Sequence, residues 1–494
     1  MGMGIGSANS TMTRRQLLRS AGTATAGLAL AGAAGEILAG AFADRAPAAP
    51  SPPRWHTRPD LRIPALTVAH SEAGVSADPI FIAPYNSPTG QAGAVIVDNR
   101  GEPIWENPLA GKVTTNFRVQ RYRGSPVLTW WEGSIELGHG VGEYVIADAS
   151  YRTVRRVQAA RGLRGDLHEF VITPRDTALL TSYVVTSADL TALGGPRGGT
   201  IQDAIFQEID LATGEVLLEW HSLDHVGLDE SYAPVGADWD FCHVNSLDLD
   251  RDGNVLVSSR STHTIYKVDR GGAVLWRLGG KRSDFQMGPG SNFAWQHHAR
   301  RQPDGTLTVF DNGATPAVER RSRGLILNVD ERAMRTTLLR QYTHPQILAG
   351  SQGSVQPLPN GNVFVGWGEA PRVSEFHRSG HMLFDAVLGE KYESYRAFRL
   401  PWSGRPAELP AIAAARAGHT VRAYASWNGA TDVSSWQLLA GPREDELRLV
   451  SGTPSRSFES TLTGAASAGP CFAVRALDAG GASLAQSRTV TVRG

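Results

Sequence analysis

The sequence predicts an all-β protein with two folded units, and three observations lead to this. The chain has 494 residues, more than one compact domain usually holds. It contains 54 glycines, with 8% aromatic and 19% charged residues, a composition typical of turn-rich β-structure. One strand pattern recurs six times through the middle of the chain, and its character changes after about residue 410. We therefore expect a six-bladed β-propeller followed by a smaller β-sandwich.

Residues 1–43 are predicted to be an export signal. Residues 13–18 read Thr-Arg-Arg-Gln-Leu-Leu, a twin-arginine signature, and an apolar run rich in Ala and Gly follows. The run ends near Ala-Phe-Ala at 41–43, a small-x-small cleavage site, and it is too short for a membrane span. We expect the twin-arginine export machinery as a partner and a secreted or extracytoplasmic location, in periplasm or cell wall. No stable membrane insertion is expected after cleavage.

The propeller is expected to occupy residues 71–405, after a Pro- and Ala-rich linker at 44–70. An alternating strand that usually ends in Asp, then a turn and a second strand, recurs at intervals of roughly 50 to 60 residues. The six copies begin with the segments 95–98, 144–148, 206–210, 265–269, 326–330 and 373–377. A second hairpin precedes most copies, around an Asp-Gly or Asn-Gly turn. Two hairpins make a four-stranded sheet, and six such sheets make a six-bladed propeller.

Residues 411–494 are predicted to form a separate accessory β-sandwich. Short strands follow the Pro-rich stretch 401–410, and they are expected at 420–427, 435–439, 471–477 and 488–492. A unit of this length fits a fibronectin-III- or immunoglobulin-like sandwich. It carries no recognisable site, so we expect it to serve stability, spacing or surface attachment.

Charge and cysteine content exclude several classes of protein. Lys+Arg and Asp+Glu are both 48, whereas a chain-wide nucleic-acid binder would show a basic excess, so no nucleic-acid partner is expected. The two cysteines, Cys242 and Cys471, are far too few for a disulfide scaffold and are expected to be free. The acidic run from Asp248 to Gly253 imitates a calcium loop. Its twelfth position is Ser259, where a bidentate Glu is required, so we interpret it as a hairpin turn.

Three histidines occupy the same phase of the repeat. His168, His243 and His297 begin the first strand of the third, fourth and fifth units, and Arg260 ends the second strand of the fourth. In a propeller blade both positions lie on one face, at the mouth of the central channel. We therefore expect a functional site there. Aromatic residues on the same face are expected to line a pocket for a flat ring. They are Trp131, Trp239, Trp295 and Trp367.

This set of side chains suits two kinds of chemistry. Three imidazoles could hold Zn²⁺ or a redox metal. Alternatively, one neutral imidazole could act as a nucleophile while the others move protons and the arginine binds a tetrahedral anion. The arginine favours the second interpretation, because a cation beside three imidazoles would repel a metal. No metal and no cofactor are therefore expected. A non-catalytic ligand-binding propeller and a metal-dependent hydrolase or oxygenase remain the alternatives.

Four motifs resemble those of the bacterial arylsulfotransferase family, over roughly residues 75–405. They are His-Val-Asn-Ser at 243–246 with Arg260 closing the next strand, Gln-His-x-Ala-Arg at 296–300, Phe-Asp-Asn-Gly at 310–313, and Ser-Tyr-Arg-Ala-Phe at 394–398. The resemblance is to the second, less characterised branch of that family. It implies a six-bladed propeller that transfers a sulfuryl group from an aryl sulfate to a phenol by a ping-pong route through a sulfohistidine. The nucleotide donor PAPS is not used, and the chain carries no phosphate-cradling Gly-rich loop.

The resemblance also implies roles for individual residues. His297 matches the nucleophile, and His243 with Arg260 matches the pair that binds the sulfuryl oxygens and assists proton transfer. His168 matches the third histidine, and Asn245 belongs to the substrate-binding motif. His298 directly follows His297, and strand alternation is expected to point the two rings to opposite sides. Residues 184–200, rich in small side chains, are expected to form a long loop or a lid over the mouth.

Overall fold

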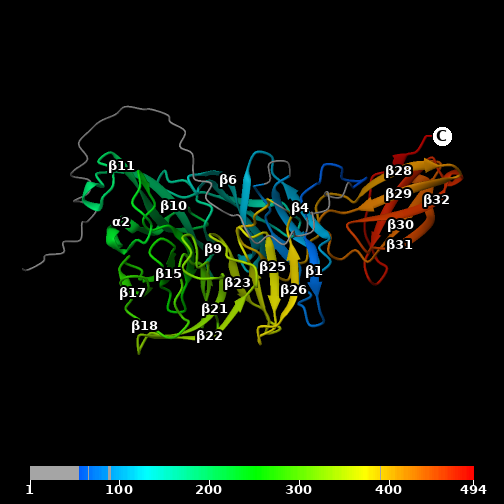
Figure 1. The fold of residues 1–494 in the computed structure, drawn as a ribbon. Helices are drawn as coiled ribbons and strands as arrows, with labels where there is room; N and C mark the ends of the chain where they lie inside the picture. Colours follow the sequence, from blue (N-terminus) through cyan, green and yellow to red (C-terminus); the bar gives the residue numbers. More distant parts are fainter. Residues whose placement is uncertain (1–54, 65, 87–90, 390, 494) are drawn as a thin grey trace, which may run out of the picture.

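The structure, a computed structural model, describes residues 55–64, 66–86, 91–389 and 391–493. These residues are almost entirely strands and turns, which confirms the all-β prediction (Figure 1). In this part of the chain no helix is long and apolar enough to cross a bilayer. The predicted export signal at 1–43 lies outside the described residues.

Six antiparallel sheets, numbered here in chain order, each contain a core of four strands. Sheet 1 contains β2 (Ile80–Ile82), β3 (Gly93–Val97), β4 (Pro103–Pro108) and β27 (Phe398–Arg399). Sheet 2 contains β5 (Val113–Tyr122), β6 (Ser125–Glu136), β7 (His139–Ala147) and β8 (Thr153–Val157). Sheet 3 contains β9 (Phe170–Ile172), β10 (Thr177–Ala188), β11 (Gly199–Asp210) and β12 (Val216–His221), with β13 (Asp238–Trp239) on β11. Sheet 4 contains β14 (Val244–Leu249), β15 (Val255–Ser259), β16 (Thr264–Val268) and β17 (Val274–Gly279).

Sheets 5 and 6 each have one additional outer strand. Sheet 5 contains β19 (His297–Arg301), β20 (Leu307–Asp311), β21 (Arg323–Asp330) and β22 (Arg335–Thr343), with β18 (Gln286–Met287) on β22. Sheet 6 contains β23 (Ser354–Pro357), β24 (Val363–Gly366), β25 (Arg372–Phe376) and β26 (Met382–Val387), with β1 (Thr67–Ser71) on β26. The short helical turns are η1 (Thr191–Leu193), between β10 and β11 of sheet 3, and α2 (Ser222–His225) and η2 (Leu228–Glu230), which follow β12.

The inner strands of the six sheets contact one another in a closed order. β5 contacts β2 and β9, β14 contacts β9 and β19, and β23 contacts β19 and β27. β27 then pairs with β2, with Phe398 opposite Phe81 and Arg399 opposite Ile80. A strand from the far end of the repeat therefore completes the first sheet and makes the arrangement propeller-like.

Buried charges join these inner strands. The carboxylate of Glu169, just before β9, contacts guanidinium groups of Arg118 in β5, Arg300 in β19 and Arg396 before β27. Arg396 reaches both carboxylate oxygens, at 3.0 and 3.1 Å, and Arg118 reaches one at 2.9 Å. Glu169 and Arg396 are fully buried. Such a group is costly to assemble and more costly to break, so it fixes which inner strands meet.

Two expectations about chain segments need correction. The linker predicted for 44–70 does not extend to its expected end, because β1 pairs with β26 and both Leu61 and Ile63 are buried. The loop or lid expected at residues 184–200 is shorter than predicted, because β10 pairs with β11 as far as Ala188 opposite Gly199, which leaves residues 189–198 as the connection. In both segments the conformation is decided by pairing with another strand, and amino-acid composition alone does not indicate such pairing.

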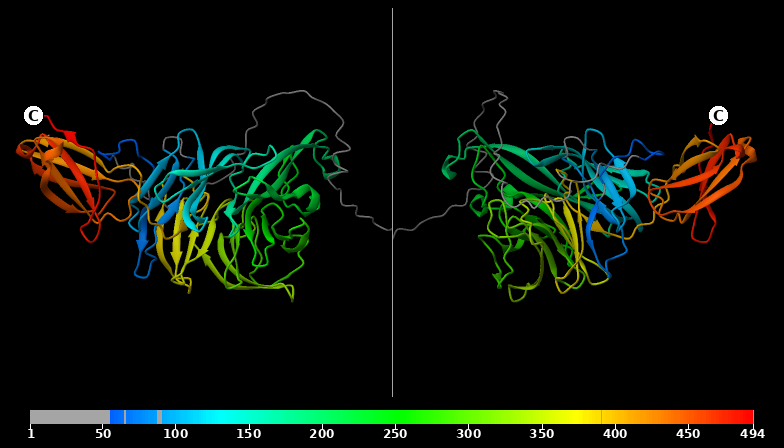
Figure 2. Two further views of the ribbon diagram at one scale, coloured as in Figure 1. Left: turned by 180° about the vertical axis from the view of Figure 1, so that it is seen from behind. Right: turned by 45° about the vertical axis from the view of Figure 1, so that its right-hand side comes forward.

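The C-terminal unit contains two sheets that share one hydrophobic core, including Val421, Leu438 and Val474. One sheet contains β28 (Ala411–Ala417), β29 (Thr420–Ser426) and β32 (Glu459–Ala465). The other contains β31 (Arg448–Pro454), β30 (Ser435–Gly441), β33 (Cys471–Leu477), β34 (Ser483–Gln486) and β35 (Val490–Thr491). The turns η3 (Glu444–Glu446) and η4 (Ala466–Ala468) connect strands. The unit stands out from the sheet 1 side of the molecule in every view (Figures 1 and 2).

Candidate functional site

The predicted histidines lie where the inner strands of sheets 3, 4 and 5 begin. His168 precedes β9, His243 precedes β14, and His297 is the first residue of β19. β-bulges or similar irregularities interrupt the strand pairing after Val244, the residue that follows His243, and after His297. His243 also has a left-handed backbone, with φ of 51°. Bulges of this kind re-aim side chains and recur at functional sites, because regular alternation would send neighbouring residues to opposite faces.

The structure brings two of the predicted histidines together and adds a third that was not predicted. The ring centroids of His168 and His243 are 4.7 Å apart. His139, at the start of β7 in sheet 2, lies 5.3 Å from His243 and 5.9 Å from His168. Its ring packs against Tyr183 at 3.8 Å. We call His139, His168 and His243 the histidine cluster.

Two aspartates hold the rings of this cluster. Asp166 Oδ2 lies 2.7 Å from Nδ1 of His168 and also accepts a hydrogen bond from the Thr181 hydroxyl at 2.9 Å. Asp240 Oδ2 contacts Nδ1 of His243, and the same oxygen lies 3.2 Å from Nε2 of His139. The latter approach is an ion-pair contact without the alignment of a good hydrogen bond. Among the described residues, no group hydrogen-bonds Nε2 of His168 or His243.

Burial and the two aspartates set the charges of the cluster. Burial lowers the pKa of His243 to about 4, although Asp240 opposes the shift. Burial also lowers the pKa of His139, but the contact with Asp240 outweighs it and the net direction is upward. Burial disfavours the charge on Asp240, yet the two histidines beside it hold its pKa well below the usual range. At neutral pH the cluster therefore contains ionised carboxylates beside a neutral His243.

His297 is buried and held in one tautomer. Its Nδ1 lies 2.7 Å from Asn312 Oδ1, which can only accept a hydrogen, so Nδ1 carries the proton. The backbone N–H of Gln352 donates to Nε2 at 3.2 Å, so Nε2 carries the lone pair. Burial, followed by the charge of Arg260, holds the pKa of His297 well below its usual value. His297 is therefore a neutral imidazole with its lone pair on Nε2.

Arg260 and Tyr395 connect His297 to its surroundings. The guanidinium of Arg260 lies 4.9 Å from the centre of the Trp295 ring and donates to the Gly350 carbonyl at 2.9 Å. The ring of Tyr395 is 6.2 Å from that of His297 and 5.6 Å from that of His168. Tyr395 thus links His297 to the histidine cluster.

Asn245 and His298 have different neighbours. The side-chain amide of Asn245 donates to the backbone carbonyl of Gln296 at 2.7 Å. The backbone carbonyl of Asn245 accepts a hydrogen bond from the Tyr395 hydroxyl at 3.2 Å. Nδ1 of His298 accepts from the backbone N–H of Val355 at 3.3 Å. Burial lowers the pKa of His298, and Arg300 and Arg396 of the Glu169 group add to the shift. The two adjacent histidines therefore have different charged neighbours.

The four tryptophans divide into two kinds. Trp295 contacts the site through Arg260. The other three are buried in sheet cores, and their indole N–H groups donate to groups within the fold, so they do not provide the pocket walls that we expected. They are Trp131, Trp239 and Trp367, which donate to Gly165 O, Ala233 O and Ser374 Oγ. Trp131 supports the site indirectly, because its ring leaves no room for a Cβ at Gly140, beside His139.

Sequence reasoning did not identify His139, Asp166 or Asp240 as site residues. The aspartates left a signal, since each stands two or three residues before its histidine in the chain. No such signal marks His139, because it follows the turn between β6 and β7 and does not stand at the start of an inner strand, as the predicted histidines do.

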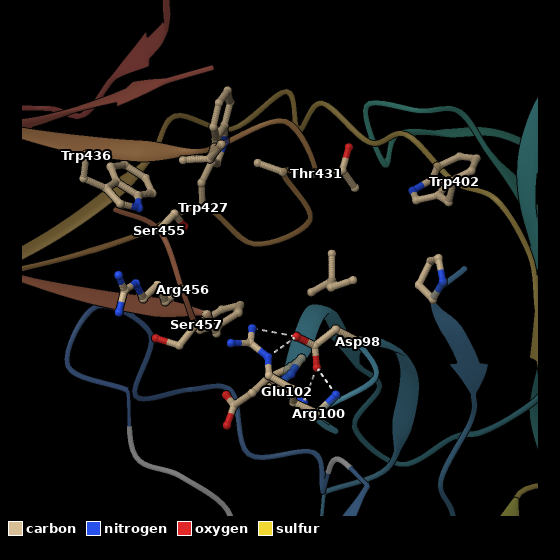
Figure 3. Close-up of a pocket in the computed structure, with 16 residues that line it drawn as sticks. Asp98, Arg100, Glu102, Trp402, Trp427, Thr431, Trp436, Ser455, Arg456 and Ser457 are labelled. Atoms are coloured by element: carbon tan, nitrogen blue, oxygen red, sulfur yellow. Dashed lines mark hydrogen bonds and ion pairs between the residues drawn. The ribbon is translucent and has the colours of Figure 1, made fainter. Parts of the chain in front are cut away.

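A cavity of about 350 Å³ lies away from this site, between sheet 1 and the C-terminal unit. Figure 3 shows Trp427 and Trp436 opposite Asp98, Arg100 and Glu102. The Arg100 guanidinium pairs with Asp98 at 2.7 Å. None of the predicted site residues lines this cavity.

The chain has similarities to known proteins and to one protein family. The chain is similar to a Bacteroides caccae protein of unknown function (12% identity, TM-score 0.41, covering 65% of this chain and 98% of that one). It is also similar to virginiamycin B lyase of Staphylococcus aureus (10%, TM-score 0.34, covering 74% and 97%). No curated protein sequence matches the chain. The family model for arylsulfotransferase (ASST) matches residues 118–389, more than half of the chain. The chain therefore belongs to the arylsulfotransferase (ASST) family.

Proposed function

We propose that this protein transfers a sulfuryl group from an aryl sulfate ester to a phenolic acceptor, without PAPS, through a sulfohistidine at His297. The observation that carries the proposal is the state of His297, a neutral ring with its Nδ1 hydrogen held by Asn312 and its lone pair on Nε2. Membership of the arylsulfotransferase family supports the same class of reaction.

In the first half-reaction, Nε2 of His297 attacks the sulfur of the donor. The N–S bond forms as the S–O(aryl) bond breaks, and the bonding pair leaves with the phenolate. The ring becomes a cationic N-sulfo imidazole whose Nδ1–H strengthens its hydrogen bond to Asn312. Arg260 is the arginine assigned to the sulfuryl oxygens, because a guanidinium donates several hydrogen bonds to a tetrahedral anion and its charge acts on His297.

In the second half-reaction, the acceptor phenol takes the sulfuryl group from His297. Its oxygen attacks sulfur, the N–S bond breaks, and the imidazole regains its lone pair. The phenolic proton passes to Nε2 of His243 or His168, each of which is held by an aspartate at Nδ1. In the first half-reaction the donor's phenolate leaves as the anion and takes up a proton from solvent, and the proton bound in the second half-reaction returns to solvent.

An assay with 4-nitrophenyl sulfate tests this proposal. The purified mature protein is incubated with and without added phenol, in the absence of PAPS, and nitrophenol release is measured. We expect release that depends on phenol, loss of release in His297→Ala, and retention in His419→Ala, which changes an exposed histidine of the C-terminal unit. Intact-mass measurement should detect one sulfuryl group on the protein when phenol is omitted. Acceptor-independent turnover would indicate a sulfatase instead, and release that survives in His297→Ala would exclude His297 as the nucleophile.

We also propose the finer architecture and the location. The six sheets are the blades of a six-bladed β-propeller, supported by the closed order of inner-strand contacts. The C-terminal unit is a fibronectin-III- or immunoglobulin-like sandwich, supported by its two sheets around one core. The twin-arginine motif supports export, and replacing both Arg14 and Arg15 by Lys should retain the protein inside the cell.

A further inference from the structure

The hairpin of β6 and β7 brings His139 into the site from sheet 2. Leu137 and Gly138 form its two-residue turn, both with a left-handed backbone at φ of 50° and 83°, and His139 begins β7. The backbone N–H of the next residue, Gly140, donates to Asp166 Oδ1 at 2.6 Å. The hairpin is thereby anchored to the segment before β9, and the histidine that follows the turn has a fixed place.

His139 is enclosed and faces one carboxylate. Its side chain is 6% exposed, and its ring lies 3.8 Å from that of Tyr183, whose hydroxyl donates to the Val244 carbonyl at 2.7 Å. Nε2 of His139 lies 3.2 Å from Oδ2 of Asp240. In the described part of the chain neither ring nitrogen has a better aligned partner, and the contact with Asp240 is the only ion pair that His139 forms there. A positive charge on His139 is therefore paired with Asp240.

Asp240 serves two histidines with one oxygen. Oδ2, which faces Nε2 of His139, also contacts Nδ1 of His243. One such atom each from His139, Asp240 and His243 lies within 4.8 Å of the others. The carboxylate thus orients the ring of His243 and leaves its Nε2 directed away from Asp240, while its negative charge is shared with His139.

This sharing decides the charge of His243. A carboxylate beside a single imidazole favours the protonated ring, and a ring that already holds two protons cannot act as a base. Burial lowers the pKa of His243 to about 4; Asp240 opposes the shift, and the charges of His168 and His139 add to it. For His139 itself, burial lowers the pKa but Asp240 raises it by more, so His139 is a cation below its ordinary value of 6.5.

We propose that His139 is a positioning residue for sulfuryl transfer: as a cation paired with Asp240, it lets that carboxylate orient His243 while His243 stays neutral, so that Nε2 of His243 accepts the proton of the acceptor phenol. The inference rests on the proposed function, because it names the base of the second half-reaction. There the phenol oxygen bonds to sulfur, the N–S bond at His297 breaks, and the phenolic proton moves to His243 and later to solvent.

Other titratable groups face these three side chains from the elements packed around them. They are Glu136 opposite His139 in β6, Tyr183 in β10, Asp166 and His168 before β9, Cys242 before β14, and Arg260 after β15. All of them are retained in the variants below, so a change can be assigned to the residue that is replaced.

NMR titration of the histidine rings in the full mature chain tests the charge of His243 without reference to activity. In His139→Gln we expect the pKa of His243 to rise, because the positive charge beside Asp240 is lost. Asp240→Asn should lower it, because the negative charge is lost. His221→Gln removes a histidine of the outer strand β12 that is paired with Asp203 at 2.7 Å, and it should leave the pKa of His243 unchanged. The signal of His243 is assigned by its loss in His243→Gln.

The two half-reactions provide the kinetic test. In His139→Gln the burst of nitrophenol without added phenol should remain at one equivalent, because no base acts in that step. Transfer from the sulfated protein to phenol should slow at low pH, so the acid limb of its pH–rate profile moves to higher pH. Each unit of rise in the pKa of His243 reduces its neutral fraction in that range about tenfold. Asp240→Asn should move the limb in the opposite direction, and His221→Gln should not move it.

The outcomes separate this inference from the proposed function. Circular dichroism and melting establish that each variant is folded, and His139→Asn replaces His139→Gln if that variant is not. An unchanged or lowered pKa of His243 in the folded variant overturns the inference, and so does a raised pKa with an unchanged profile or with slowing that is equal at every pH. Absence of transfer by the parent protein rejects the proposed function, and the NMR titration then still decides whether His139 sets the charge of His243.

Discussion

The side-chain oxygen of Asn312 accepts the Nδ1 hydrogen of His297 at 2.7 Å and so decides which ring nitrogen of His297 carries the lone pair. Asn312 is itself held, because its amide donates to the carbonyls of Ala349 and Gln352 at 3.1 and 3.0 Å. The amide therefore cannot rotate without losing three hydrogen bonds. A fixed acceptor of this kind keeps the imidazole of His297 in the tautomer that the proposed attack by Nε2 requires.

Replacing Asn312 should impair transfer without removing the nucleophile. In Asn312→Leu the ring loses its orienting acceptor, and we expect kcat/KM for sulfuryl transfer to fall about 10- to 100-fold. In Asn312→Asp a carboxylate replaces the amide oxygen and raises the pKa of His297, so more of the ring is protonated at low pH. The acid limb of the pH–rate profile should therefore move to higher pH in Asn312→Asp. An unchanged profile in both variants would contradict this role.

Removing the carboxylate of Glu169 should strongly destabilise the closed arrangement of the six sheets. Glu169→Gln leaves the guanidinium groups of Arg118, Arg300 and Arg396 without their buried counter-charge. Breaking a buried ion group from one side costs about 3–5 kcal/mol of unfolding free energy, measurable by urea titration. Glu446→Gln, which removes an exposed partner of Arg443, should cost no more than about 1 kcal/mol. Equal effects of the two variants would mean that the ion pairs of Glu169 do not stabilise the arrangement of the six sheets.

A side chain at Gly429 should disturb the junction between sheet 1 and the C-terminal unit. Gly429 has φ of +96°, and a Cβ there would meet the Tyr151 ring and lie 2.8 Å from the Trp105 ring. Gly429→Ala should therefore increase proteolytic cleavage within 401–410 and lower the melting temperature. Gly481→Ala introduces a similar backbone strain, at φ of +80°, with no atom within 4 Å of the new Cβ. If the two variants are cleaved equally, the close packing at Gly429 is not what holds the junction.

The stability of the protein should fall as the pH drops from about 6.5 to about 4, and His263 should account for part of the loss. Burial, then the charges of Arg260 and Lys281, lower the pKa of His263 to about 4. In this window the unfolded chain binds a proton that the folded chain does not, so acid favours unfolding. His263→Gln should reduce the loss of unfolding free energy by up to about 3 kcal/mol, measured by urea titration at each pH. His419→Gln, at an exposed position, should retain the parent slope.

Much of the fold could be predicted because it depends on local patterns that repeat. The alternating strands and their Asp-Gly and Asn-Gly turns indicated the hairpins of sheets 4, 5 and 6, which the structure has at β14–β15, β19–β20 and β23–β24. The paired strand β1 was assigned to a linker, because a strand at a sheet edge is specified by its partner β26 rather than by its own composition.

The candidate site was predictable only where it follows the repeat. His168, His243 and His297 share one phase, and the family motifs agree with it. The sequence pattern places Trp131 and Trp367 on the same face as the histidines, but both are fully buried in hydrophobic cores. Large apolar side chains are usually buried where sheets pack against one another.

By itself, the sequence determined the strand periodicity, the division into a repeat region and a C-terminal unit, and the family, because each is written in residue types and spacings along the chain. Only the tertiary structure decided that His139 joins His168 and His243, that Asp240 lies between His139 and His243, and that Asn312 holds His297. The three histidines of the cluster come from different sheets, whereas Asn312 directly follows β20 and His297 begins the neighbouring strand β19 of sheet 5. The geometry of the histidine cluster depends on how the six sheets pack against one another, and no local pattern in the chain records that packing.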